Sequence, residues 1–178
     1  MSASVLLNQD QIQLTIERLS REVIESFDAA NTVIIGVQPR GVFLAKRLHD
    51  RIETLTGKSI LLGKIDETFH RDDFRRGKTL NASTTEIDFE IENKTVLLVD
   101  DVLYTGRTIR AAMDALLSFG RPKKIELLVL VDRRFNRELP IQPDFTGQTI
   151  DTIEENVKVF VEWKQNGAKQ DAVIFIND

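Results

Sequence analysis

The amino-acid sequence predicts an α/β fold in which a parallel sheet is flanked by helices on both faces. Three observations predict it: short runs rich in Val, Ile and Leu, apolar residues at helical spacing between those runs, and the regular alternation of the two patterns. With 178 residues, the chain is long enough to bury the core of a single domain. Ligands of such sheets bind beyond the carboxyl ends of the strands, so functional residues are expected in the loops there.

Each element follows from these two patterns. Apolar residues recur at helical spacing over 10–27, over 41–57 and from 108 to about 119, and a glycine ends each of the last two helices. Residues 67–94 are polar with little helical period, which indicates a mobile functional loop or an extruded hairpin. The predicted strands cover 32–37, 59–65, 95–101, 125–131, 157–163 and 171–176.

Composition and charge limit the classes of function that the protein can have. The 24 basic and 28 acidic residues give a net charge of −4, so RNA binding would need a local basic patch. The absence of cysteine excludes disulfides, thiolate metal sites and cysteine nucleophiles. The N-terminus lacks the pattern of a signal peptide, and no apolar stretch approaches the roughly 18 residues of a membrane span. These features predict a soluble cytoplasmic protein.

The strand at 95–101 ends in two aspartates and leads into a turn that starts a helix. Adjacent strand residues point to opposite faces, so at least one of Asp100 and Asp101 must leave the core. Ionised carboxylates accept hydrogen bonds from ribose hydroxyls, directly or through Mg²⁺. The turn at 105–108 offers backbone N–H groups and the helix dipole to a phosphate. This order predicts a ribose-5-phosphate site, and the alternative is that the aspartates merely cap a turn.

The segment 96–108 resembles the phosphoribosyl-pyrophosphate signature of the type I phosphoribosyltransferases. Its form D-D-V-L-Y-T-G-R-T is most similar to the branch of bifunctional pyrimidine operon regulators and uracil phosphoribosyltransferases. Segments 36–48, 68–73 and 131–141 are similar to further blocks of the same family. The resemblance implies a five-stranded parallel core, a flexible loop at about 67–94, and a small hood formed partly by residues 133–178.

The resemblance also implies roles for individual residues. Asp100 and Asp101 would act in catalysis and hold Mg²⁺, through water or the substrate ribose, and Arg71 would meet the developing charge. Its loop neighbours Asp72, Asp73, Arg75 and Arg76 belong either to a closing loop or to a solvated hairpin. The residues expected to contact 5-phosphoribosyl 1-pyrophosphate (PRPP) are Pro39, Arg40, Gly41, Val102, Leu103, Tyr104, Thr105, Gly106, Arg107 and Thr108.

Pro39 stands where the regulator branch commonly has threonine, and it makes a cis peptide bond after Gln38 far less costly than one before another residue. A proline also gives up one backbone N–H. The alternative interpretation is a turn that simply starts a helix.

The base-side residues are expected to be Asp132, Arg133 and Arg137, in a loop one residue longer than the pattern typical of the regulators. The related enzymes that act on hypoxanthine or guanine carry an acidic residue where this chain has Tyr104, so the resemblance favours uracil as the acceptor. The expected reaction converts uracil and PRPP to UMP and pyrophosphate in a homodimer or larger assembly. A purine acceptor, or binding without turnover, stays open.

A second function implied by the resemblance is UMP-responsive binding of an mRNA leader, alone or together with catalysis. The candidate RNA contacts are Arg18 and Arg21 on the first helix and Arg134 in the base-side loop. The two helix arginines can equally belong to a solvated face. The acidic segment 147–156, where regulators tend to show threonine, serine and lysine, weighs against RNA binding.

Overall fold

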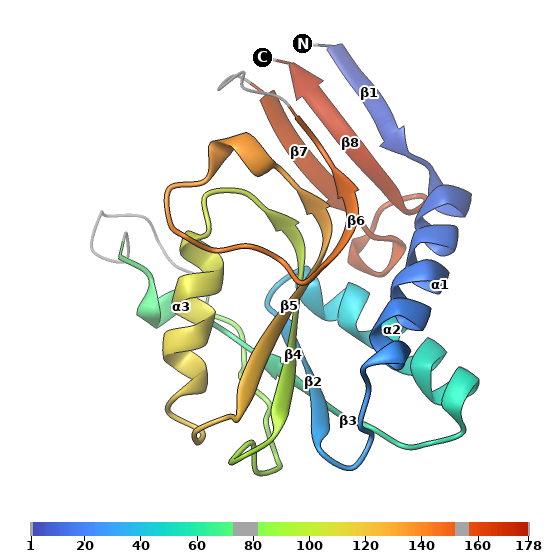
Figure 1. The fold of residues 1–178 in the computed structure, drawn as a ribbon. Helices are drawn as coiled ribbons and strands as arrows, with labels where there is room; N and C mark the ends of the chain where they lie inside the picture. The colour runs from blue at the N-terminus through green and yellow to red at the C-terminus, as the bar shows by residue number, and fades with distance from the viewer. Residues whose placement is uncertain (1, 73–81, 152–156, 178) are drawn as a thin grey trace.

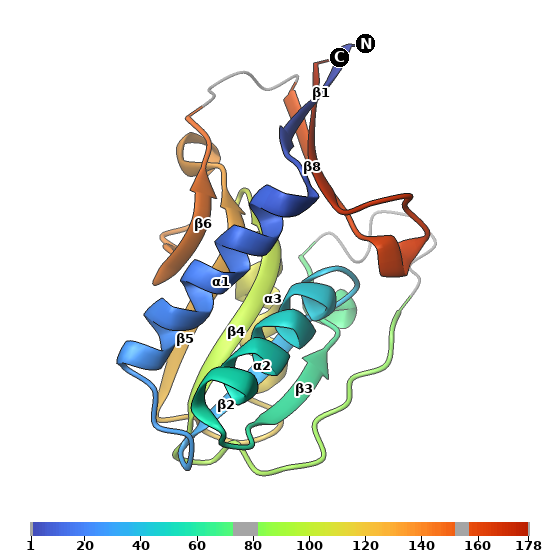
Figure 2. The ribbon, with the colours of Figure 1, turned by 90° about the vertical axis from the view of Figure 1, so that its right-hand side faces the viewer.

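In the computed structural model, which describes residues 2–72, 82–151 and 157–177, five parallel strands form a central sheet in the order β3–β2–β4–β5–β6 (Figure 1). A second, antiparallel sheet has the order β1–β8–β7 and lies beyond the carboxyl ends of the central strands (Figures 1 and 2). We call this three-stranded sheet the hood. The strands and helices are β1 (Ser2–Leu7), α1 (Gln9–Glu25), β2 (Thr32–Val37), α2 (Gly41–Thr56), β3 (Leu61–Ile65), β4 (Thr95–Leu103), α3 (Arg107–Leu116), β5 (Lys124–Asp132), β6 (Phe145–Thr149), β7 (Val157–Glu162) and β8 (Ala172–Asn177).

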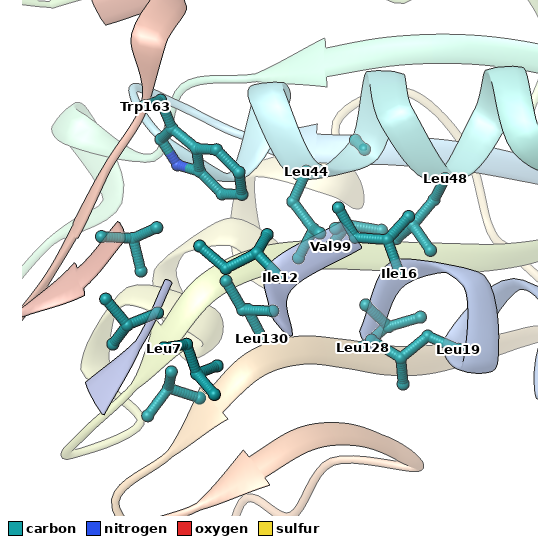
Figure 3. Packing of buried hydrophobic residues seen from close by; sticks show 14 of the residues in the cluster. Leu7, Ile12, Ile16, Leu19, Leu44, Leu48, Val99, Leu128, Leu130 and Trp163 are labelled. Carbon is teal, nitrogen blue, oxygen red and sulfur yellow. The ribbon is translucent and has the colours of Figure 1, made fainter. Parts of the chain in front are cut away.

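The predicted fold class is confirmed, and the parallel sheet explains why its strands are apolar throughout. Alternate residues of β2, β4 and β5 face two separate clusters. One cluster packs against α1 and α2, which lie side by side over one face of the sheet (Figure 2). The other packs against α3, which lies over the opposite face (Figure 1). Trp163 sits in the first cluster, near Leu44 of α2 and Ile12 of α1 (Figure 3).

The structure contains two strands that the sequence did not predict. β1 pairs with β8, so the hood takes one of its three strands from the N-terminal end of the chain. β6 pairs with β5 at one edge of the central sheet. Both strands are short, and their pairing partners rather than their own apolar pattern make them strands.

The later part of the polar stretch 67–94 packs on the edge of the central sheet. Lys64 of β3 and Glu86 form an isolated antiparallel bridge, with backbone hydrogen bonds of 2.9 Å in both directions. Ile87 and Phe89 turn inward onto the α3 cluster, and Ile91 is fully buried there. No helix in the described ranges is long and apolar enough to span a membrane.

Candidate functional site

The carboxyl ends of β2, β3 and β4 meet beneath the hood, and the residues that follow them enclose a cavity of about 270 Å³. Three loops of the core and one strand of the hood supply its walls. The lining residues are Gln38, Pro39, Arg40, Glu67, Arg71, Asp100, Asp101, Val102, Tyr104, Thr108, Val159 and Phe160. The structure therefore brings together residues that the sequence predicted for one site. They are the loop after β2, the acid pair Asp100 and Asp101, and the loop arginine Arg71.

Asp100 and Asp101 form the buried acidic side of this cavity. Each is only 7% exposed, and the backbone N–H of Asp101 donates to Oδ1 of Asp100 at 2.8 Å. Burial raises the pKa of both carboxyls, and for Asp100 the charge of Asp101 raises it further. Oδ2 of Asp101 has no hydrogen-bond partner, and Nε of Arg40 lies 3.9 Å from it. These acceptors are arranged for donors or a cation brought by a ligand.

A second cavity of about 170 Å³ adjoins the first and is shaped by the turn between β4 and α3. The two cavities share Arg71, Asp100, Val102, Tyr104 and Thr108 among their lining residues. The N-cap residue of α3, Gly106, provides no side-chain cap, whereas α1 begins with a capping box. A helix N-terminus attracts anions through its N–H groups and dipole. The turn can therefore hold a phosphate beside the carboxylates.

Gly106 is the residue that allows this turn. It caps α3 with φ of 91°, a conformation that side chains other than glycine rarely adopt. A Cβ at this position would also lie 3.3 Å from Cδ1 of Ile141. The base-side loop thus closes over the outside of the phosphate turn.

Not every predicted PRPP contact offers its side chain to the cavity. The Leu103 side chain is buried in the α3 cluster, so only its backbone can face a phosphate. Arg107 is half-exposed and forms ion pairs with Glu138, at 2.6 Å, and with Asp72. Its backbone N–H donates to Oγ1 of Thr105 at 3.3 Å.

The loop between β2 and α2 forms the opposite wall. The peptide bond between Gln38 and Pro39 is cis, as the sequence allowed. A Cβ on Gly41 would lie 2.5 Å from the carbonyl oxygen of Val99 and 2.9 Å from Cα of Asp100. Glycine is therefore required for the start of α2 to lie directly against the acid pair.

Arg71 lies where the two cavities join. Its Nη1 is 3.4 Å from Oε1 of Glu67 and 3.5 Å from Oγ1 of Thr108. The predicted loop residues Asp73, Arg75 and Arg76 lie outside the described residues.

Sequence reasoning missed Glu67, whose side chain is 8% exposed and lines the cavity with the acid pair. Burial raises the pKa of its carboxyl, while the nearby Arg71 lowers it. The available signal was its place two residues after the end of β3. Val159 and Phe160 of β7 were missed as well, because only the fold brings the hood strand to the cavity.

Two of the predicted base-side residues, Arg133 and Arg137, contact Tyr104, which precedes the phosphate turn. Arg137 donates to the carbonyl oxygen of Tyr104 and to Oδ1 of Asp132. The guanidinium of Arg133 lies 4.1 Å from the ring centroid of Tyr104, and Arg133 itself is only 4% exposed. Arg137 is thus engaged in holding two predicted site residues, Tyr104 and Asp132, in place.

We expect the Arg137→Met variant to lose roughly 3 kcal/mol of unfolding free energy, because Asp132 would keep a buried charge without its partner. The side chains of this pair are 15% and 8% exposed. Urea unfolding followed by circular dichroism measures the loss. Arg134→Met is the matched control in the same loop: Arg134 and Asp151 are 56% and 51% exposed, so its change should stay within about 1 kcal/mol. Equal losses in the two variants would contradict a structural role for Arg137.

The three predicted RNA contacts lie at the surface and are each paired with carboxylates. Arg18 pairs with Glu22 at 2.6 Å and also donates to the carbonyl oxygens of Thr146 and Gly147 in β6. Arg21 pairs with Glu17 at 2.7 Å. Arg134 pairs with Asp151 at 2.8 Å. Part of the guanidinium of Arg18 is therefore used to hold α1 against β6.

Comparisons with known proteins agree with this geometry. A family model described as the phosphoribosyl transferase domain matches residues 2–164. The "Bifunctional protein PyrR" of Microcystis aeruginosa is 52% identical over 159 residues, which cover 88% of this chain and 89% of that protein. The protein of the same name from Nostoc punctiforme is 44% identical over 182 aligned residues, covering 100% of both chains.

Solved structures of related fold were also found. A hypoxanthine phosphoribosyltransferase of Trypanosoma cruzi is similar with a TM-score of 0.73 and 15% identity, covering 98% of this chain and 96% of that one. A hypoxanthine phosphoribosyltransferase of Staphylococcus aureus is similar with a TM-score of 0.71 and 20% identity, covering 96% and 90%. At these identities the likeness shows the fold alone.

Proposed function

From the premise that this chain belongs to the phosphoribosyltransferase family, and within it to the bifunctional PyrR proteins, we propose that it transfers the phosphoribosyl group of PRPP to uracil. The products are UMP and pyrophosphate. One observation carries the proposal: the buried acid pair, Asp100 and Asp101, lines both a cavity and, through Asp100, the adjoining phosphate turn. Carboxylates that accept hydrogen bonds from hydroxyl groups, placed beside an anion site, are complementary to a ribose 5-phosphate.

Different residues of the site bind different parts of PRPP. The turn at 105–108 and the start of α3 bind the 5′-phosphate, and the acid pair accepts hydrogen bonds from the ribose hydroxyls. Arg40 and the start of α2 face the pyrophosphate. During transfer, the bond from ribose C1′ to a pyrophosphate oxygen breaks, a bond from C1′ to uracil N1 forms, and the N1 proton of uracil passes to water or to the departing pyrophosphate. The developing charges lie between fixed carboxylates and arginines, so positioning and electrostatics supply the rate enhancement.

The site fits Mg²⁺ that arrives with its substrate. Oδ2 of Asp101 is a buried acceptor without a partner, which suits a cation. Among the described residues no group of three acidic or histidine side chains is placed to hold a metal alone, so substrate oxygens and water would complete the shell. When bound, Mg²⁺ supplies charge neutralisation of the pyrophosphate.

The choice of uracil rests on the residue that precedes the phosphate turn. Tyr104 is 38% exposed and its ring is stacked on Arg133, so this position offers a phenol rather than a carboxylate. A carboxylate base for a purine ring is therefore lacking at this place in the turn. Asp132 lies at the end of β5, next to β4, and Arg137 holds it.

The test is base-dependent release of pyrophosphate from PRPP and Mg²⁺. Uracil, hypoxanthine, guanine, xanthine and orotate are supplied separately to the purified protein. Turnover with uracil alone supports the proposal. Turnover with a purine instead would show that Tyr104 does not set the acceptor, and no turnover with any base would contradict transferase activity.

A second function, UMP-responsive RNA binding, is supported by membership of the PyrR proteins and by the arginines on α1 and in the base-side loop. The side chains of Arg18, Arg21 and Arg134 are 47%, 63% and 56% exposed. Their ion pairs would have to open, or share the guanidinium, for phosphates to bind. A gel shift with RNA corresponding to the leader of a pyrimidine operon, with and without UMP and at two salt concentrations, tests this function. An RNA affinity that changes neither with UMP nor with salt concentration would contradict this function.

A further inference from the structure

The hood forms the wall of the site that faces away from the central sheet, and β7 is the strand that reaches the ligand cavities. Phe160 lines the acid-pair cavity and also a neighbouring cavity of about 500 Å³ between Arg40 and the segment 160–168. The guanidinium of Arg40 lies 5.9 Å from the ring centroid of Phe160. Val157, Val159 and Val161 of β7 are buried in the cluster beneath α1 and α2, whereas Phe160 borders open space on the side of residues 38–41, which we call the pyrophosphate loop. The position of Phe160 therefore depends on these core contacts and on how the segment that follows β7 is fixed.

The end of β7 is fixed through Trp163. This side chain is 1% exposed and packs in the core cluster beside Leu44 of α2 (Figure 3). Its ring centroid lies 6.4 Å from that of Phe43, also on α2. Trp163 therefore joins the hood to the helix that begins at the pyrophosphate loop.

Arg47, one turn further along α2, covers the same tryptophan. Its guanidinium lies 4.4 Å from the ring centroid of Trp163. Its Nη2 donates to Oε1 of Gln165 at 2.7 Å and pairs with Oδ2 of Asp171 at 2.8 Å. Oδ1 of Asp171 in turn accepts the backbone N–H of Lys164 at 2.8 Å. The side chains of Arg47 and Asp171 are only 19% and 14% exposed, so water screens this ion pair weakly.

These contacts connect one side chain of α2 to three points of the segment between β7 and β8. We propose that Arg47 is a positioning residue that holds strand β7 of the hood, and with it Phe160, at the distance from the pyrophosphate loop that uracil requires. The proposal rests on the proposed transferase function for its kinetic test, and on geometry alone for its spectroscopic test.

The kinetic test compares Arg47→Met with wild type. Methionine keeps the apolar stem that packs on the indole and removes the charge and the donors. We expect KM for uracil to rise about tenfold, while kcat and KM for PRPP stay within about twofold, because in this proposal Phe160, which lines the same cavity as Tyr104, contacts uracil equally in the ground state and the transition state. Arg47→Lys keeps the charge without the planar fork, so its KM for uracil should fall between those of the other two proteins.

Arg51→Met is the matched control. Arg51 lies one turn further along the same helix, and its Nη2 donates to Oε1 of Glu17 on α1 at 2.9 Å, away from the hood. Its KM for uracil should equal that of wild type. The proposal is overturned if Arg47→Met leaves KM for uracil unchanged, or if Arg51→Met raises it as much.

The spectroscopic test needs no turnover, because Trp163 is the one tryptophan of the chain. Acrylamide quenching of its fluorescence should increase in Arg47→Met and stay unchanged in Arg51→Met, with both variants showing the circular dichroism of wild type. If wild type fails to use uracil but the quenching differs as expected, the transferase proposal fails and the hood attachment stands. Unchanged quenching in Arg47→Met would overturn the attachment itself.

Discussion

Asp100→Asn should greatly slow turnover and, at the same time, raise the melting temperature. The asparagine keeps the acceptor for the Asp101 N–H but replaces a negative oxygen with a donor, so the ribose hydroxyls lose a charged acceptor. We expect kcat for uracil to fall roughly 100-fold or more. Pyrophosphate release under saturating PRPP and Mg²⁺ measures the loss.

The gain in stability follows from the raised pKa of Asp100, which burial causes first and the charge of Asp101 second. A carboxyl with a raised pKa in the folded state stabilises the fold while it is protonated, and that contribution is lost as the pH rises through the raised pKa. Above that raised pKa, wild type therefore carries a buried charge that Asp100→Asn lacks. We expect a rise of a few degrees, since about 1 kcal/mol shifts the melting temperature by ~2–4 °C in a chain of this size.

The difference in melting temperature between the two proteins should widen as the pH rises through the raised pKa of Asp100, which calorimetry over a series of pH values measures. Asp114→Asn is the control, because Asp114 is 47% exposed on α3 and pairs with Arg110 at the surface. That variant should leave both activity and melting temperature close to wild type. An Asp100→Asn protein that melts well below wild type over the whole pH series would contradict a destabilising charge in the acid pair.

Gly41→Ala should damage both the fold and the site. The added Cβ would lie 2.5 Å from the carbonyl oxygen of Val99 and 2.9 Å from Cα of Asp100, and both are backbone atoms of β4. That strand is hydrogen-bonded to β2 and β5 on either side, so it cannot move away. The start of α2 must move instead. We expect a loss of roughly 3 kcal/mol in stability and about 100-fold in kcat/KM.

The matched control is Gly57→Ala at the other end of the same helix. Gly57 has a φ of 66°, but no atom lies within 4 Å of a Cβ built there. Its variant should show backbone strain of about 1 kcal/mol and normal kcat/KM. Comparable activity losses in the two variants would mean that the contact between α2 and the acid pair does not matter for catalysis.

The parts of the fold that could be predicted are the elements whose own residue pattern identifies them as helix or strand. β2, β4 and β5 are covered on both faces, so each is a continuous apolar run. β6 is different: its sequence F-T-G-Q-T has little strand character, and Gly147 is there because a Cβ would lie 2.4 Å from the carbonyl oxygen of Leu130. Such a close approach can be seen only once the neighbouring strand is in place.

The candidate site likewise contains residues that the sequence could predict and residues that it could not. The acid pair and the phosphate turn are contiguous in the chain, so their order alone predicted a ribose 5-phosphate site. Glu67 and Phe160 reach the cavity from β3 and from the hood, and no local pattern marks them. Arg137 was predicted at the base, but the structure pairs it with Asp132 and the Tyr104 carbonyl, contacts that depend on the course of the longer loop.

The pairing of β1 with β8 has a consequence for how the protein is made. Ser2 of β1 lies opposite Asn177 of β8, so β1 is synthesised long before its sheet partner, with the whole central sheet between them in the sequence. A nascent chain can assemble the central sheet through β6 while β1 still lacks its neighbour. Contacts this distant in sequence form slowly. The hood wall of the acid-pair cavity, which includes Phe160, is therefore completed only after the central sheet has been synthesised, and until then the growing polypeptide has the turn at 105–108 but no enclosed cavity beside it.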